Sequence, residues 1–145
     1  MLDWKLWKGW PMMKEGNGKL ILIAFIIIVL DQLSKFYAKH NWDYVINYGA
    51  SFSILQGYRW LFIIVAILVI FLIFYYNEKK YLLAFGFILG GTIGNLIDRV
   101  FLGYVIDFVD IKIIPIFNVA DIANTVGAIL LLIGLAYGST KHRKK

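Results

Sequence analysis

The sequence contains no cysteine and only two histidines among its 145 residues. The lack of cysteine excludes disulfides and thiolate metal sites. The two histidines, His40 and His142, lie far apart beside different apolar runs, so we expect no histidine-based metal site. Basic residues outnumber acidic ones by 15 to 9, but they gather in particular loops and are not interleaved with aromatic residues on a soluble sheet. We therefore expect no nucleic-acid partner.

Hydrophobic residues are abundant, at 61% of the chain, against about 45–50% in an average soluble domain. They fall into long runs separated by short polar stretches, as transmembrane helices do. The runs cover residues 20–37, 60–76, 81–99 and about 118–137. We predict an all-α membrane protein with four transmembrane helices. The membrane domain covers residues 20–138, between a cytoplasmic or interfacial segment, 1–19, and a basic cytoplasmic tail, 139–145.

Positive charges divide unevenly between the two sides of such a bundle. Four spans place both termini on one side, together with the short loop at residues 77–80. Ten of the fifteen Lys and Arg residues belong to that side and five to the other. Because cytoplasmic loops carry the excess of Lys and Arg, we expect both termini in the cytoplasm and the two longer connections at the outer face.

The polar segments carry further signals. Trp4, Trp7 and Trp10 recur every three residues, which suits either an interfacial helix or a poorly ordered tail. The segment DYVINYGASFSIL, residues 43–55, interleaves β-branched and aromatic residues with Asn, Gly and Ser. This composition predicts a small β-rich extracytoplasmic platform, with Asn47 turned toward a site.

Small residues form a stripe in the third predicted span. Gly86, Gly90 and Gly94 recur every four residues, on one face of a helix. A stripe of this kind lets another helix approach closely.

Polar residues recur near the outer end of three predicted spans. Such residues at membrane depth face the bundle interior or a water-filled cavity, and they either join helices or carry a function. They are Asp31, Gln32, Lys35, Asn95, Asp98, Arg99, Asn118, Asp121 and Asn124. Asp31 has Lys35 four residues later, and Asp98 has Arg99 beside it, so a purely structural pairing is a strong alternative for these acids.

Two acids lack a local base. Asp121 has no basic residue within four positions, and Asp107, between Ile106 and Phe108, has none either. Two neighbouring carboxylates share a proton, so one activates water while the other protonates a leaving group, as in aspartic proteases. Proton or cation transport also uses intramembrane acids, and a catalytically silent scaffold stays open as well. Transport is less favoured because these acids lie at the predicted edge of the membrane and no internal repeat is visible.

Five short motifs, in order along residues 20–137, resemble those of the lipoprotein signal peptidase (signal peptidase II) family. They are DQLSK, NYGASFS, GGTIGNLIDR, VIDF and FNVAD. The resemblance implies a four-span aspartic peptidase of the bacterial cytoplasmic membrane. It places the catalytic pair on Asp107 and Asp121, the substrate-binding residues on Asn47, Asn95, Arg99 and Asn118, and supporting polar residues on Asp31, Lys35 and Asp98.

The family removes signal peptides from prolipoproteins just before a cysteine that carries diacylglycerol. The partners implied are therefore these precursors and membrane lipids, and no metal or organic cofactor is expected. The chain departs from the family at Ser34, where Thr is usual, and at Ser51, where Ala is usual. The connection between Asp107 and Asp121 looks short, and the Trp-rich N-terminus has no counterpart in the family.

Overall fold

The computed structural model describes residues 17–49, 57–76 and 78–142. It is mostly helical, with one two-stranded sheet. In chain order the elements are α1 (Asn17–Asn41), β1 (Val45–Asn47), α2 (Arg59–Tyr75), the 3₁₀ helix η4 (Lys79–Tyr81), α3 (Leu82–Phe101), β2 (Val105–Asp107) and α4 (Val119–His142). The Trp-rich N-terminus and residues 50–56 of the predicted platform lie outside the described residues.

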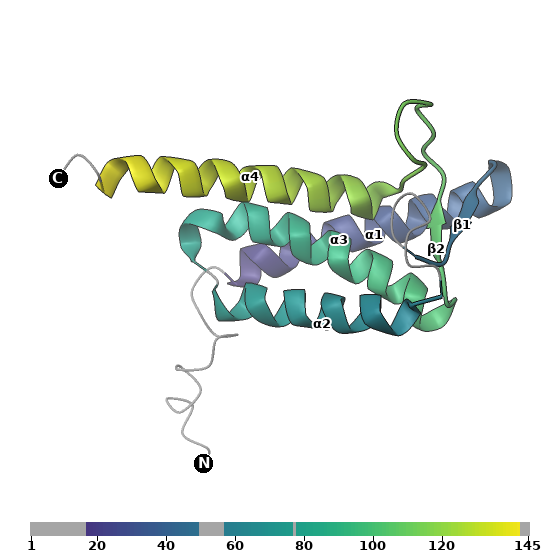
Figure 1. The fold of residues 1–145 in the computed structure, drawn as a ribbon, viewed down its shortest axis with the longest axis horizontal. Helices are drawn as coiled ribbons and strands as arrows, with labels where there is room; N and C mark the ends of the chain where they lie inside the picture. Colours follow the sequence, from purple (N-terminus) through teal and green to yellow (C-terminus); the bar gives the residue numbers. More distant parts are fainter. Residues whose placement is uncertain (1–16, 50–56, 77, 143–145) are drawn as a thin grey trace, which may run out of the picture.

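The four apolar runs form helices, as predicted. Three of the described helical segments, Asn17–Asn41, Lys79–Phe101 and Val119–Tyr137, are long and apolar enough to cross a membrane. The fourth, Arg59–Tyr75, is shorter. The helices run side by side, and α1 begins at the end of the bundle where α4 finishes, with the sheet at the opposite end (Figure 1). The first and last helices are longer than the predicted membrane domain: α1 begins before residue 20 and α4 ends after residue 138.

Helix α3 lies at the centre of the bundle and packs against the other three helices. Its glycine stripe is the reason for the close packing with α1: a Cβ added at Gly86 would meet Ile23, and one at Gly90 would meet Ile27. Gly91, on another face of α3, lies against the backbone of α4. The predicted close approach at the stripe is thus confirmed, and α1 is the helix that uses it.

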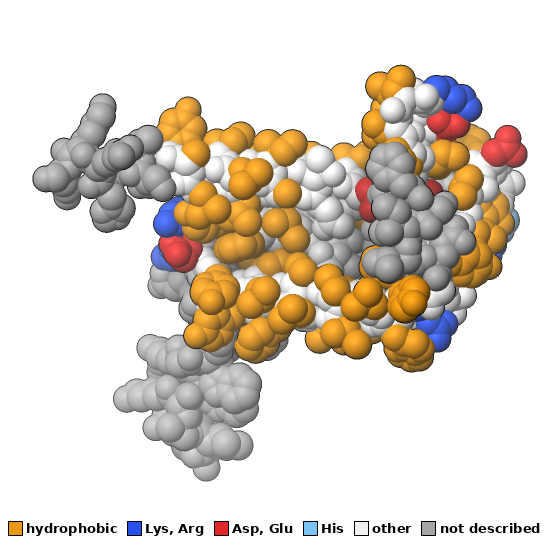
Figure 2. Space-filling view, in the orientation of Figure 1, with side chains coloured by type: hydrophobic (Ala, Val, Ile, Leu, Met, Phe, Trp, Pro, Cys, Tyr) orange, Lys and Arg blue, Asp and Glu red, His pale blue; other side chains and the backbone are white. Residues whose placement is uncertain are grey.

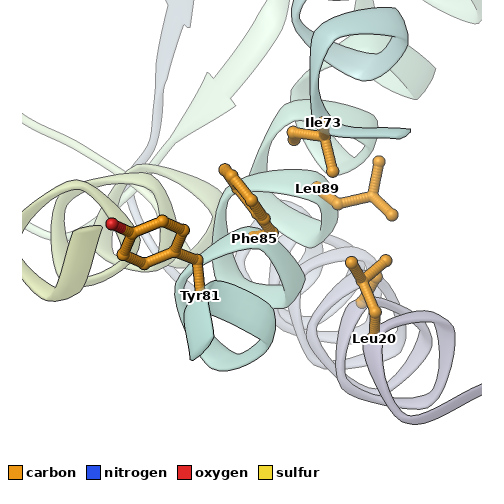
Figure 3. Packing of buried hydrophobic residues seen from close by; sticks show 6 residues of the cluster. Leu20, Ile73, Tyr81, Phe85 and Leu89 are labelled. Carbon is orange, nitrogen blue, oxygen red and sulfur yellow. The ribbon is translucent and has the colours of Figure 1, made fainter. Parts of the chain in front are cut away.

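A buried apolar cluster joins α1, α2 and α3 near the end of the bundle away from the sheet. Leu20, Ile73, Phe85 and Leu89 belong to it, and Tyr81 closes it beside the turn between α2 and α3 (Figure 3). Elsewhere large apolar side chains point outward along the helices, and charged side chains appear mainly at the two ends (Figure 2). An apolar outer surface of this extent suits contact with lipid.

The predicted platform is a small antiparallel sheet. Val45 lies opposite Asp107, and Asn47 lies opposite Val105. Beyond β2 the chain leaves the sheet as a loop and returns, closed by a bridge between Val109 and Phe117. The sheet therefore fixes Asn47 and Asp107 as near neighbours at one end of the helical bundle.

Candidate active site

Helix α4 begins with a reciprocal cap that fixes Asp121. The backbone N–H of Asp121 donates to Oδ1 of Asn118 (3.0 Å), and the backbone N–H of Asn118 donates to Oδ2 of Asp121 (3.1 Å). This arrangement is a capping box, in which an N-cap side chain and an acid three residues later satisfy each other's backbone donors. The carboxylate of Asp121 is thus held by local sequence at the first turn of α4.

The same asparagine reaches the second acid. Nδ2 of Asn118 donates to Oδ1 of Asp107 (2.6 Å), while Nδ2 of Asn47 donates to Oδ2 (2.9 Å). Asp107 is the last residue of β2 and is only 3% exposed. Burial raises the pKa of its carboxyl, the charge of Asp121 raises it further, and the hydrogen bond from Asn47 opposes both effects.

Asn95 of α3 holds the other oxygen of Asp121. Its Nδ2 donates to Oδ1 of Asp121 (2.9 Å). Its Oδ1 accepts from Lys35 Nζ (3.0 Å) and from Asn118 Nδ2 (3.1 Å). Because the side-chain oxygen of Asn95 already faces two donors, its NH₂ group is left to face Asp121.

Behind this layer lies a buried ionic cluster. Nζ of Lys35 is 2.8 Å from Asp31 and 2.9 Å from Asp98, and all three side chains are at most 3% exposed. Together with the bond to Asn95, these contacts use all three N–H donors of the ammonium group. Asp31 in turn accepts the backbone N–H of Ala120 (2.9 Å), which secures the start of α4.

One expected pairing differs in the structure. The sequence suggested Arg99 as the base for Asp98, whereas Asp98 pairs with Lys35 of α1. Arg99 instead lies over the ring of Phe62, 4.9 Å from its centroid, and donates from Nη2 to the carbonyl oxygen of Gly49 (3.1 Å). Sequence neighbours on a helix point in different directions, so Asp98 faces the core while Arg99 faces the cavity.

The two acids open into one cavity of about 260 Å³. Asn47 of β1 and Asn95 and Arg99 of α3 also line it, so three polar side chains converge there with Asp107 and Asp121. The lining residues are Asn47, Phe62, Val65, Ala66, Val69, Thr92, Asn95, Arg99, Val105, Asp107, Asp121 and Asn124. Among the described residues no group of three or more His, Cys, Asp and Glu side chains has a metal-binding arrangement.

The sequence model described as signal peptidase (SPase) II matches residues 23–137. The chain belongs to the signal peptidase II family. It is therefore a peptidase, and the matched range includes every site residue described above. Its apolar helices make it an integral membrane protein.

Named relatives and solved structures agree with this membership. A lipoprotein signal peptidase of Caldicellulosiruptor bescii is 43% identical, over 76% of this chain and 85% of the relative. One from Clostridioides difficile is 40% identical, over 85% and 98%. A solved bacterial membrane enzyme is 29% identical and superposes with a TM-score of 0.80, covering 88% of this chain and 93% of the other. A second superposes with a TM-score of 0.72 at 31% identity, covering 81% and 92%.

Within this candidate site, Asn118 has a different position from the one we expected for a substrate-binding residue. Its side chain is fully buried, and it contacts the two acids and Asn95 rather than the cavity. Two further polar residues join the site. Gln32 donates to Asp98 (3.1 Å), and Asn124 lines the cavity one turn after Asp121. The sequence contained a signal for each of them. Gln32 is part of the motif DQLSK, and Asn124 is one of the polar residues near the start of the fourth apolar run.

Proposed function

We propose that this protein is an aspartic endopeptidase that removes the signal peptide from diacylglyceryl-modified prolipoproteins, cutting before the modified cysteine. The observation that carries the proposal is that Asp107 and Asp121, from different elements, hydrogen-bond to the same buried Asn118 and line one cavity. Convergence of two acids without their own bases is the arrangement that acid–base peptide hydrolysis needs. The family supports the reaction, since its named relatives are lipoprotein signal peptidases.

In the proposed mechanism the two acids share one proton, which Asp107 holds at rest. Burial and the neighbouring charge of Asp121 both favour the protonated form of Asp107. Ionised Asp121 takes a proton from a water molecule as that water attacks the scissile carbonyl carbon. Asp107 then gives its proton to the nitrogen of the leaving cysteine, and the C–N bond breaks. The pair ends with one proton, now on Asp121.

Preorganised amides keep the two acids in place during this exchange. Each carboxylate oxygen of the pair accepts one N–H group, from Asn47, Asn95 or Asn118. Donors fixed before the reaction do not have to reorganise as charge moves between the acids. We assign Asn118 to this positioning role. Arg99 and Asn47, which line the cavity, are the groups we propose for binding the substrate backbone and the glyceryl ester.

The signal peptide is proposed to lie along α3 between α2 and α4. A second cavity of about 400 Å³ continues from the first toward the end of the bundle away from the sheet. Both include Val69, and the second is lined almost entirely by apolar residues of α2, α3 and α4, among them Ile73, Phe85 and Leu131. An apolar helix placed there buries its side chains against apolar walls and brings its end to the two acids.

We further propose four spans, with both termini in the cytoplasm of a bacterial cell and the site near the outer face. Helix α2 has 17 residues, the lower limit of about 17–25 for a transmembrane helix. The even number of spans and the excess of Lys and Arg that the sequence carries in the terminal segments and the loop at residues 77–80 agree with this orientation. Labelling of tags at both termini in intact cells tests it, and an externally labelled C-terminus would contradict it.

Cleavage of a purified substrate tests the function. The parent protein should release the signal peptide from a diacylglyceryl-modified prolipoprotein in detergent or in vesicles. The Asp107→Asn and Asp121→Asn variants should release none, while their thermal unfolding shows a folded protein. A parent protein without peptidase activity that instead carries protons or cations into sealed vesicles would favour transport.

A further inference from the structure

Asp121 borders two cavities rather than one. Besides the cavity that it shares with Asp107, it lines another of about 560 Å³, between the start of α4 and the loop that precedes it. The other residues that line this 560 Å³ cavity are Ile114, Pro115 and Phe117 of the loop and Ile122, Asn124, Thr125 and Val126 of α4. Only Asp121 and Asn124 belong to both cavities, so the two spaces meet beside the catalytic carboxylate that we propose.

The loop that forms one wall is held at its base and at its tip. Phe108 and Val109 donate their backbone N–H groups to the carbonyl oxygen of Phe117 (3.0 and 2.8 Å). At the tip, Asp110 accepts the backbone N–H of Lys112 (2.8 Å) and its ammonium group (2.5 Å). Figure 1 shows this loop standing away from the bundle beside α4. These hydrogen bonds hold the loop in a defined turn, so this wall of the cavity is formed without any rearrangement of the loop.

The rim of this cavity is strongly apolar. Ile113 at the loop tip is 84% exposed, and Ile114 and Ile122, which line the cavity, are 52% and 46% exposed. Leaving such side chains in water costs about 25 cal/mol for each Å² of apolar surface. Lipid is a more suitable environment, and the cavity volume is in the range of roughly 300–1,000 Å³ for small-ligand sites.

We propose that this cavity binds an acyl chain of the substrate's diacylglyceryl group, on the side of Asp121 away from the signal-peptide groove. The inference rests on the proposed function. The bond to be cut joins two apolar groups, the signal helix and the lipid-bearing cysteine. Asp121 borders the cavity beside the loop on one side and, on the other, the polar cavity that leads past Val69 to the apolar cavity between α2, α3 and α4. The mature polypeptide fits this space less well, since its backbone N–H and C=O groups need partners and the cavity's uncharged polar side chains are only Asn124 and Thr125.

Filling the cavity should weaken binding of long acyl chains selectively. The test variant is Val126→Trp, which places a large ring among the residues that line the cavity. The matched control is Leu132→Trp, also on α4, at an exposed position that lines none of the three cavities described here. With a dipalmitoyl substrate, Val126→Trp should raise KM about tenfold, while KM for a short-chain dihexanoyl substrate should change by less than about twofold.

Leu132→Trp should change neither KM, and kcat should stay near the parent value in both variants. An equal KM increase for both substrates, or no increase, would overturn the proposal. If the parent cleaves neither substrate, the proposed function itself fails, and this outcome is distinct from a loss of chain-length dependence.

A labelling experiment locates the chain even if Val126→Trp does not fold. A substrate with a photoreactive diazirine at the end of one acyl chain is bound to Asp107→Asn and irradiated. The label should attach to residues 113–117 and 122–126. A label on α1 or α2 would overturn the proposal, and so would labelling of the same residues from a diazirine placed after the cysteine.

Discussion

Lys35 of α1 and Asp98 of α3 form a buried ion pair, with Nζ 2.9 Å from Oδ2 and both side chains only 3% exposed. The residues are 63 positions apart, so the pair exists only when the two helices pack. The lysine also holds Asn95, which in turn holds Asp121. The core of the membrane bundle and the geometry of the proposed catalytic pair thus depend on the same ammonium group.

Lys35→Met should destabilise the folded protein strongly. Loss of the ammonium group leaves Asp31 and Asp98 buried without their partner, a change that typically costs about 3–5 kcal/mol. Thermal unfolding in detergent measures it, with Lys80→Met as the control. Lys80 pairs with Glu78 on the surface, where both side chains are more than half exposed, so that variant should unfold near the parent temperature. Equal midpoints for the two variants would contradict the importance of the buried cluster.

The two acids that we propose as catalytic, Asp107 and Asp121, should behave as one unit. Asp107→Asn and Asp121→Asn should each abolish cleavage, and the double variant should be little worse than either single variant, since loss of one partner already removes the shared function. Initial rates at saturating substrate measure this. Asp110→Asn is the control, because Asp110 lies in the loop with Lys112 and outside the cavity. Strong residual cleavage by Asp107→Asn would move the second catalytic role to another acid.

The raised pKa of Asp107 predicts how stability depends on pH. The ordinary value is 3.8, and burial raises it in the folded state. Between these two pKa values the folded protein binds more protons than the unfolded chain, so the contribution of this carboxyl to stability falls as pH increases. The free energy of unfolding of the parent, minus that of Asp107→Asn, should therefore be largest below pH 3.8 and decrease as pH rises above it. A difference that does not change with pH would contradict the raised pKa.

Substitution of Asn47 provides a second test of the pKa of Asp107. Its hydrogen bond lowers the pKa of Asp107, so Asn47→Ala should raise that pKa further. If Asp107 holds the proton that goes to the leaving amine, the fall of kcat at high pH should shift to higher pH in this variant. A shift to lower pH would instead assign the acid role to Asp121.

Arg99→Lys should keep the charge and lose much of the activity. The planar guanidinium stacks on Phe62 and at the same time donates to the Gly49 carbonyl, and a lysine ammonium cannot do both in this geometry. We expect kcat/KM to fall about tenfold to a hundredfold, with little change in unfolding temperature. Arg59→Lys is the control, because Arg59 also stacks on an aromatic ring, that of Trp60, but lies outside the cavity. Full activity of Arg99→Lys would make Arg99 a simple charge anchor.

Several parts of this structure follow from local sequence, and others do not. The apolar runs predicted the helices, and the absence of a nearby base singled out Asp107 and Asp121. The motif FNVAD contains the capping box between Asn118 and Asp121, which depends only on residues three apart. The pairing of Lys35 with Asp98 could not be predicted in this way, because it depends on which faces of two helices meet.

The surroundings of the acids depend on tertiary packing in the same sense. Asn118 was expected at the cavity surface, yet the return of β2 toward α4 buries it between the two acids. The 560 Å³ cavity needs the loop at residues 108–117 to lie beside α4, and this position comes from backbone hydrogen bonds at Phe117 rather than from any motif. Composition suggested a short connection there but not its shape.

Gly91→Ala should separate activity from stability. A Cβ at Gly91 would come closer than 3 Å to the carbonyl oxygen of Ala120 and to the side chain of Asn124, in the turn of α4 that carries Asp121. The backbone cannot rotate away as a flexible side chain can, so α4 must shift from α3, and misplacement by about 1 Å costs on the order of a hundredfold in rate. The control is Gly18→Ala, which meets nothing within 4 Å in helix α1 and should be neutral or slightly stabilising. We expect Gly91→Ala to lose cleavage at temperatures where thermal unfolding still shows it folded. Parent-like cleavage by this variant would mean that the start of α4 tolerates displacement, and that the two acids do not depend on the packing at Gly91.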